Sequence, residues 1–162
     1  MDKDYDAKNK KNDWNDIIKC IKFTDEPMKI VINDTLSIRD IQEKFSERYP
    51  FLKIEFFRKE HSKHTGSKKE LMIPSDMLLQ DCRSVHNKGN LEIHPSTTVM
   101  KLEQEFQESY GLSAQVFRKS GDVWIETTVT DDWTLAKQNE EAESFYNAVQ
   151  EAKKTDRNQL LL

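Results

Sequence analysis

The chain repeats one pattern of residues after an interval of 61 positions. Four residues recur unchanged: Phe45, Glu47, Tyr49 and Phe56 correspond to Phe106, Glu108, Tyr110 and Phe117. In each copy a short apolar run is followed by apolar residues spaced three and four apart, and then by a second apolar run. This order predicts a strand, an amphipathic helix and a second strand, so we expect two such units in tandem.

The boundaries of the expected elements follow from the turn and cap residues. The first copy should form a strand over 29–33, a helix that ends at Tyr49 before Pro50, and a strand over 51–59. The second copy should form a strand over 91–94, a helix over 98–110 and a strand over 112–119. The turn at 120–122 then predicts a hairpin into a strand over 123–129, and a long polar helix should run to about residue 154.

This element order predicts an α+β fold, a ferredoxin-like two-layer sandwich with an added edge strand and a C-terminal helix. Two helices would pack on one face of a single antiparallel sheet, with 30–32 and 91–93 as neighbouring central strands. Strand alternation and helical spacing give the expected core: Ile30, Ile32, Ile38, Ile41, Phe45, Leu52, Ile54, Phe56, Leu91, Ile93, Val99, Leu102, Phe106, Ala114, Val116 and Ile125.

The chain of 162 residues is expected to form one domain over 28–154. Its parts are repeat one at 28–59, an insertion at 60–90, repeat two at 91–119, and the hairpin strand and helix at 120–154. We expect residues 1–27 to be an N-terminal tail with room for a short helix, and residues 155–162 to be a C-terminal tail.

Composition narrows the classes of function. The net charge of −4 argues against general nucleic-acid binding, which usually shows as a basic surface. No apolar run approaches the roughly 20 residues that cross a bilayer, and the first residues lack the apolar stretch of a signal peptide. Cys20 and Cys82 have neither metal-ligand spacing nor a disulfide framework. We therefore expect a cytoplasmic protein with no membrane segment, no metal and no cofactor.

An aromatic row is expected on the sheet face opposite the core. Alternation places Phe57, Phe117 and Trp124 there, with Glu126 among the charges between them. Exposed, this row would be a binding surface of the kind on which nucleic-acid bases stack. Covered, it would be a second small core beneath the N-terminal or C-terminal helix. We favour the covered arrangement, because open apolar patches of this size are rare without a partner.

The most basic stretch is the loop at 58–69, where five cations and one glutamate give a local charge of +4. Its candidate binding residues are Arg58, Lys59, His61, Lys63, His64, Lys68 and Lys69. The loop could hold a phosphate or an acidic partner, but we favour a solvated loop. His61 and His64 lack a carboxylate or cysteine at ligand spacing, so no metal site is expected.

A second polar cluster is expected in the segment that carries two tryptophans and a run of threonines. Its candidate residues are Arg118, Lys119, Glu126, Asp131 and Asp132. In the functional interpretation these side chains converge near one end of the sheet as a polar site. In the structural interpretation, which we favour, the segment forms a hairpin, an edge strand and the capped start of the last helix.

The same segment carries a family resemblance. The pattern FRKSGxVWxETTxTDxWTL over 117–135, with Gln138-Asn139, resembles a family of uncharacterised proteins from Bacteroidetes-type bacteria. Leu52-Lys53-x-Glu55-Phe56-Phe57 in the first repeat is similar to the same family, and the resemblance covers roughly 28–143. It implies a bacterial origin and brings no activity, substrate or catalytic residue.

The sequence predicts a small binding or protein-interaction module without catalysis, whose partner is another protein or a second copy of the chain. One alternative is a nucleic-acid-associated module that uses the loop at 58–69 and the aromatic face. A second alternative is an enzyme with a polar site between Arg118 and Asp132. No catalytic residue is predicted, because the spacing of titratable residues does not require a catalytic pocket.

Overall fold

The computed structural model describes residues 26–58 and 69–159. The short helix expected in the N-terminal tail, the residues of the basic loop from Lys59 to Lys68, and the last three residues lie outside the described residues.

The described chain alternates strands and helices in the expected order. Its elements are β1 (Met28–Ile32), α2 (Ile38–Arg48), β2 (Leu52–Phe57), the 3₁₀ turn η1 (Lys69–Leu71), α3 (Leu79–Cys82), β3 (Gly89–Ile93), α4 (Val99–Tyr110), β4 (Ser113–Ser120), β5 (Val123–Glu126), the 3₁₀ turn η2 (Thr128–Thr130) and α5 (Leu135–Gln159). This confirms a mixed α+β fold. Two boundaries differ from expectation by three residues or more: the last strand ends at Glu126, and the last helix continues beyond residue 154 into the expected tail.

Local sequence explains where the two matched helices begin and end. Ser37 and Asp40 form a capping box at the start of α2, in which each side chain accepts a hydrogen bond from the other residue's backbone N–H. Thr98 caps α4 by accepting from Lys101 N. Gly111 ends α4 with φ of 63°, and a Cβ there would lie 2.7 Å from Val85 N.

The strands form two antiparallel sheets, where a single ferredoxin-like sheet was expected. β1 pairs with β3 in a two-stranded ribbon, and β2, β4 and β5 form a three-stranded sheet in that order. A ferredoxin-like sheet would have placed β1 and β3 between β2 and β4. The difference arises because alternation in a strand identifies its buried face, whereas it does not specify which strand lies beside it.

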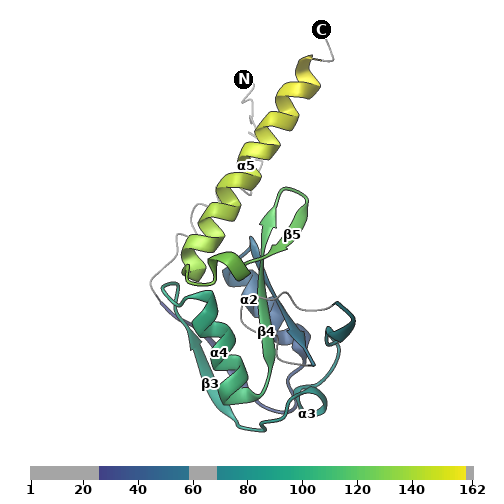
Figure 1. Ribbon diagram of the computed structural model, residues 1–162, viewed down its shortest axis with the longest axis vertical. Helices are drawn as coiled ribbons and strands as arrows, with labels where there is room; N and C mark the ends of the chain where they lie inside the picture. The colour runs from purple at the N-terminus through teal and green to yellow at the C-terminus, as the bar shows by residue number, and fades with distance from the viewer. Residues whose placement is uncertain (1–25, 59–68, 160–162) are drawn as a thin grey trace, which may run out of the picture.

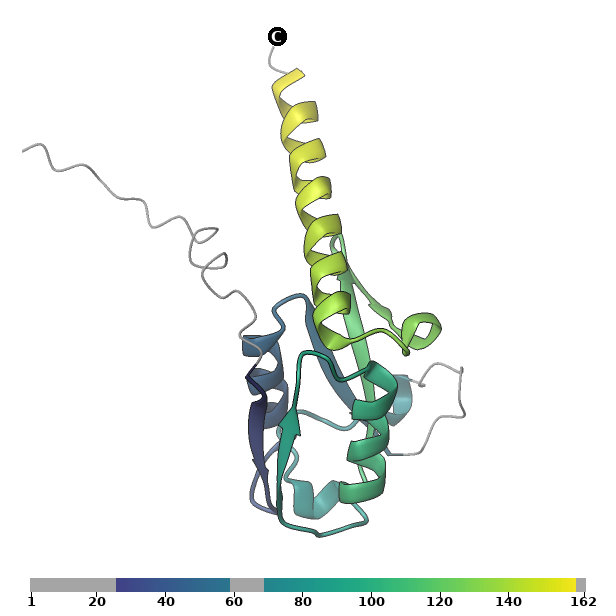
Figure 2. The same ribbon diagram turned by 90° about the vertical axis from the view of Figure 1, so that its left-hand side faces the viewer.

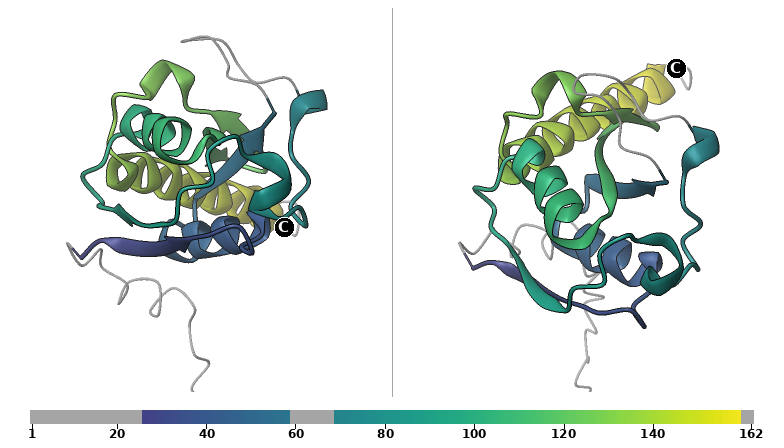
Figure 3. Two further views of the ribbon diagram at one scale, coloured as in Figure 1. Left: turned by 90° about the horizontal axis from the view of Figure 1, so that it is seen from below. Right: turned by 60° about the horizontal axis from the view of Figure 1, so that its bottom comes forward.

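The two sheets and the helices α2 and α4 surround one hydrophobic core (Figure 3). Phe56 on β2 meets Phe106 on α4 edge to face, with ring centroids 5.1 Å apart. The expected core residues are buried, with one exception: Ile125 lies exposed on β5. The prediction for Ile125 was wrong because β5 extends past the ends of α2 and α4, beyond the layer that covers the rest of the sheet (Figure 1).

The starts of α2 and α4 are held by equivalent backbone hydrogen bonds. Ile38 N donates to Met77 O at 3.0 Å, and Leu79 N donates to Leu36 O at 2.8 Å. At α4, Val99 N donates to Trp133 O at 3.1 Å, and Leu135 N donates to Thr97 O at 2.9 Å. The segment before α3 is therefore hydrogen-bonded to the start of α2 in the same way that the segment before α5 is hydrogen-bonded to the start of α4.

These two docked helices differ in length. α3 ends after 4 residues, whereas α5 continues for 25 residues and runs out of the body of the molecule (Figure 1, Figure 2). Leu135 and Ala142 near its start are buried against the body. From Glu143 to Arg157 every side chain is at least partly exposed.

Candidate functional site

The β4–β5 hairpin extends from the body beside α5 and carries three consecutive apolar residues that remain exposed (Figure 1). Val123, Trp124 and Ile125 are 58%, 38% and 37% exposed. Gly121, with φ of 62°, supplies the left-handed backbone that the turn requires. We call β5 together with its β4 neighbours Phe117 and Lys119 the hairpin surface.

The pairing register divides the hairpin surface between two faces. Ile125 lies opposite Arg118, and Val123 lies opposite Ser120, on the face that continues the core side of the sheet. Trp124 lies opposite Lys119, and Glu126 opposite Phe117, on the other face. Because side chains on opposite strands of an antiparallel pair share a face, one face offers Val123 and Ile125, and the other offers Trp124 and Glu126.

Two lysines lie over the aromatic rings of the hairpin surface. Lys53 Nζ is 4.9 Å from the centre of the Phe117 ring and 5.5 Å from that of Trp124. Lys119 Nζ is 5.5 Å from the Trp124 ring. Lys53 also pairs with Glu55 at 3.1 Å, whereas Lys119 forms no ion pair within the described part of the chain. The ammonium group of Lys119 therefore lies beside the Trp124 ring.

Helix α5 supports the hairpin at two levels. Near the base, the Tyr146 ring packs on Phe51 with centroids 5.6 Å apart and lies 5.4 Å from Lys119 Nζ. At the turn, Lys153 Nζ pairs with Asp122 Oδ2 at 2.6 Å. Phe145 on the same helix is 52% exposed. Helix and hairpin thus project together, with β5 on the side of β4 away from β2.

The expected aromatic row is partly covered. Phe57 is buried and forms a backbone bridge with Met72 of the insertion. Phe117 is half-buried, and Trp124 is exposed. The expectation that α5 covers the row is not met for Trp124, because Tyr146 reaches Lys119 and Phe51 in place of the indole. The sequence did not indicate that the insertion returns to the edge of β2.

In the predicted polar cluster between Arg118 and Asp132, Arg118 is engaged with residues at the start of α5, whereas Glu126 and Asp131 both lie near Glu103. Arg118 donates to Gln138 Oε1 at 3.3 Å and stacks on Trp133, with its guanidinium carbon 5.8 Å from the ring centre. Lys119 and Glu126 belong to the opposite face of the sheet. Arg118 therefore anchors the start of α5, in agreement with the structural interpretation.

A half-buried glutamate beside β4, Glu103, was not predicted from the sequence. Glu103 Oε1 on α4 accepts hydrogen bonds from Val116 N at 2.9 Å and Gln115 Nε2 at 3.1 Å, just below the point where β5 leaves β4. Burial is the main cause that raises the pKa of Glu103 to about 8; the nearby carboxylates of Asp131 and Glu126 act in the same direction, and the hydrogen bond from Val116 N opposes them. Glu103 follows Leu102 in the helical pattern, a position that does not distinguish it from the exposed glutamates of α4.

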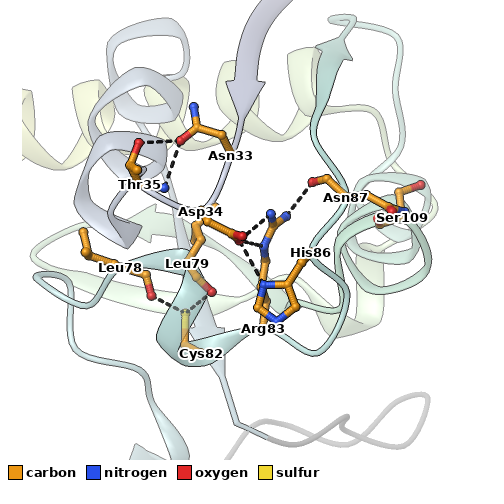
Figure 4. Close-up of polar contacts among 10 residues, drawn as sticks. All are labelled: Asn33, Asp34, Thr35, Leu78, Leu79, Cys82, Arg83, His86, Asn87 and Ser109. Atoms are coloured by element: carbon orange, nitrogen blue, oxygen red, sulfur yellow. Dashed lines mark hydrogen bonds and ion pairs between the residues drawn. The ribbon is translucent and has the colours of Figure 1, made fainter.

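A second polar group joins the two halves of the chain at the other end of the molecule (Figure 4). Asp34 Oδ1 accepts from Arg83 Nη2 at 2.7 Å, from Arg83 Nε at 2.9 Å, and lies 3.0 Å from His86 Nδ1. These hydrogen bonds hold the pKa of Asp34 below its usual value. Arg83, whose side chain is fully buried, also donates to Asn87 O at 2.9 Å. The separation of Asp34 from Arg83 in the sequence gave no signal for this group.

A surface hollow of about 620 Å³ adjoins this group. It is lined by two segments, 31–35 and 88–90. Asp34 and Lys88 place opposite charges on its lining, so it does not select for one sign of ligand charge. The side chain of Arg83 ties the turn after β1 to the segment before β3, because its hydrogen bonds go to Asp34 and to Asn87 O.

The basic loop is described only at its ends. Arg58 is exposed, and its backbone N–H donates to Leu71 O at 3.0 Å, which continues the bridge between β2 and the insertion. Lys69 begins η1. His61, Lys63, His64 and Lys68 lie outside the described residues, so phosphate binding by this loop stays a prediction.

Comparison with protein-family models, with curated proteins and with solved structures found no match for this chain. Among the described residues, no three histidine, cysteine or acidic side chains gather in an arrangement that could hold a metal ion. Within the same residues, no helix has the length and apolar character needed to span a membrane.

Proposed function

We propose that this chain is a protein-binding module without catalysis, and that its binding site is the hairpin surface. The observation that carries the proposal is the exposure of Val123, Trp124 and Ile125 on an edge strand. Exposed sheet edges are usually protected by lysine, proline or a bulge, because their unpaired backbone groups recruit other strands. β5 is short and ends in Glu126, but its first three residues, Val-Trp-Ile, include neither a charged residue nor a proline.

The absence of catalysis is proposed because of how the polar residues are distributed. An active site needs titratable groups that converge in a concave pocket. Arg118 is engaged with Gln138 and Trp133, and Lys119 and Glu126 lie on the other face of the sheet. The hairpin surface offers apolar contact and free backbone groups, which are the elements of strand-addition binding.

The experiment is site-specific photo-crosslinking in the native host. A photoreactive residue replaces Val123, and a matched control replaces Val31, which is also 58% exposed but lies on β1. A protein captured at 123 and not at 31 is then purified, and its Kd is measured for wild type, Val123→Asp and Val31→Asp. We expect Val123→Asp to weaken binding about tenfold or more, which corresponds to roughly 1.4 kcal/mol. Capture at 31 alone, or equal affinity of all three proteins, would refute the proposal.

Nucleic-acid binding is the second candidate, favoured by the lysines beside Phe117 and Trp124. Single-strand binders combine aromatic platforms with positive charge in this way. The net charge of −4 weighs against it. Titration with single-stranded oligonucleotides while Trp124 fluorescence is followed tests it, and any affinity should fall as salt rises if Lys53 and Lys119 contact phosphates.

We also propose that the two halves of the chain arose by duplication, with α3 and α5 as counterparts. The matched hydrogen bonds at the starts of α2 and α4 support this. A bacterial origin, which the family resemblance over 117–135 implies, and a cytoplasmic location, which the composition predicts, remain our proposals for its setting.

A further inference from the structure

We infer that the partner at the free edge of β5 is a second copy of this chain, which adds its own β5 in antiparallel orientation across a two-fold axis. The inference rests on the proposed function and names the partner of the same surface. It concerns three observations: the backbone groups that point away from β4, the division of side chains between faces, and the charge beside Trp124.

The backbone of β5 has free hydrogen-bonding groups toward solvent. Lys119 N donates to Phe51 O at 2.9 Å, so the N–H of Lys119 points toward β2 and away from its cross-strand neighbour Trp124. In an antiparallel pair, directly opposed residues alternate between hydrogen-bonded and non-hydrogen-bonded pairs. The N–H and C=O groups of Trp124 and of Glu126 therefore point outward from the sheet, ready to bond a further strand.

The side chains of β5 are self-complementary when a two-fold axis passes through Ile125, perpendicular to the sheet. Ile125 then meets Ile125 of the second copy on one face, and Trp124 meets Glu126 of the second copy on the other face, twice by symmetry. In this register, residues that lie directly opposite each other have their side chains on the same face of the sheet, as antiparallel pairing requires. Trp124 and Glu126 also exchange backbone hydrogen bonds with their symmetry partners in this register.

Charge favours this register over its neighbour. Glu126 of the second copy would lie beside Trp124, where Lys119 Nζ sits 5.5 Å from the ring centre without an ion-pair partner among the described residues. An axis through Trp124 would instead place Asp122 opposite Glu126 of the second copy, and like charges directly opposed in a sheet are destabilising. A register shifted by one residue would reverse the faces.

The size of the contact predicts a weak dimer. Stable interfaces bury roughly 1,200–2,000 Å² in total, and one short strand with a few flanking side chains supplies less. We therefore expect a Kd between roughly 10 µM and 1 mM for self-association. An unrelated extended segment would gain the same backbone bonds. The second copy is preferred because its own sequence supplies an isoleucine for one face and a carboxylate for the other.

The test is sedimentation equilibrium of the full chain over a range of concentrations, with a charge-swap cycle. Glu126→Lys and Lys119→Glu should each raise the Kd about tenfold or more, since each places like charges across the axis. The double variant K119E/E126K restores an attractive pair and the wild-type net charge, so its Kd should return to within about threefold of wild type. Glu92→Lys, an equal charge change on β3, is the control and should leave the Kd unchanged. Unfolding curves confirm that all four variants fold.

The outcomes separate the inference from the proposed function. A chain that stays monomeric at all concentrations, while residue 123 still captures a different protein, overturns the inference and leaves the proposed function standing. If the chain dimerises and neither single charge reversal changes the Kd, the dimer uses another surface, and this result also overturns the inference. A monomeric chain without any capture at 123 removes both. Weaker self-association in both single variants, together with a Kd near that of wild type in the double variant, supports the two-fold pairing of β5.

Discussion

The half-buried side chain of Glu103 makes the stability of this protein fall as pH rises. Burial raises the pKa of Glu103 from 4.5 to about 8. For a group whose pKa is raised by folding, stability is fully present below the unfolded pKa and is lost as pH rises through the folded pKa. A shift from 4.5 to about 8, at 1.36 kcal/mol per pKa unit, corresponds to an upper limit of about 5 kcal/mol.

The perturbation that isolates this effect is Glu103→Gln. Glutamine keeps an oxygen that accepts from Val116 N and Gln115 Nε2, as Glu103 Oε1 does at 2.9 Å and 3.1 Å, but it cannot ionise. The free energy of unfolding of E103Q relative to wild type should therefore increase with pH. Between about pH 5.5 and about pH 8.5 we expect this difference to grow by about 3 kcal/mol in favour of the variant.

Urea unfolding at a series of pH values measures the difference. Glu108→Gln is the control, since Glu108 is an exposed residue of the same helix. The titration of histidines and exposed carboxylates is common to all three proteins and cancels in the comparison. Parallel pH curves for wild type and E103Q would refute the reasoning, because they would show that folding does not shift the pKa of Glu103.

Further predictions concern the core, the Asp34 group and α5. Phe45→Ala and Phe106→Ala should each cost roughly 3–5 kcal/mol in urea unfolding, since both rings are fully buried, and a loss below about 1 kcal/mol would contradict their place in the core. Asp34→Asn should lower the unfolding midpoint at neutral pH by leaving buried Arg83 without its carboxylate. Because the pKa of Asp34 is lowered in the folded protein, wild type should lose this stability as pH falls below about 4. If the unfolding midpoint of Asp34→Asn falls as much in acid as that of wild type, the prediction is contradicted. Deleting 147–162 should change the unfolding free energy by less than about 1 kcal/mol, whereas deleting 134–162 removes buried Leu135 and should cost several times more.

The spacing of apolar residues was sufficient to predict the order of strands and helices in the described chain. The stripe of Ile38, Ile41 and Phe45 has one structural solution, a helix with one buried side. Strand pairing was not predictable in the same way, since Leu52 and Ile54 are equally well buried whether β2 pairs with β3 or with β4. A second repeat is also present in the sequence: Asp76 and Leu79 recur as Asp132 and Leu135. This repeat marks the equivalent segments before α3 and α5.

The candidate site was predicted only in part. Phe117 and Trp124 were identified from alternation, and Lys119 was identified as a member of the polar cluster; the structure places all three on one face of the hairpin surface. Ile125 was assigned to the core, because alternation cannot indicate how far the covering helices extend along a strand. Glu103 and the Asp34 group depend on contacts between distant parts of the chain, and such contacts leave no periodic trace in a sequence.

The attachment of α5 to the hairpin has an entropic consequence for binding. A two-stranded hairpin alone in water is only marginally stable and samples many conformations. Here Tyr146 of α5 packs on Phe51, which accepts a hydrogen bond from Lys119 N, and Lys153 pairs with Asp122 in the turn, so the hairpin is attached to α5 before any partner arrives. A partner therefore does not have to supply the free energy for ordering this segment, which otherwise costs about 0.5–1.5 kcal/mol for each immobilised side chain. Through these contacts, helix α5 preorganises the edge of β5 for binding.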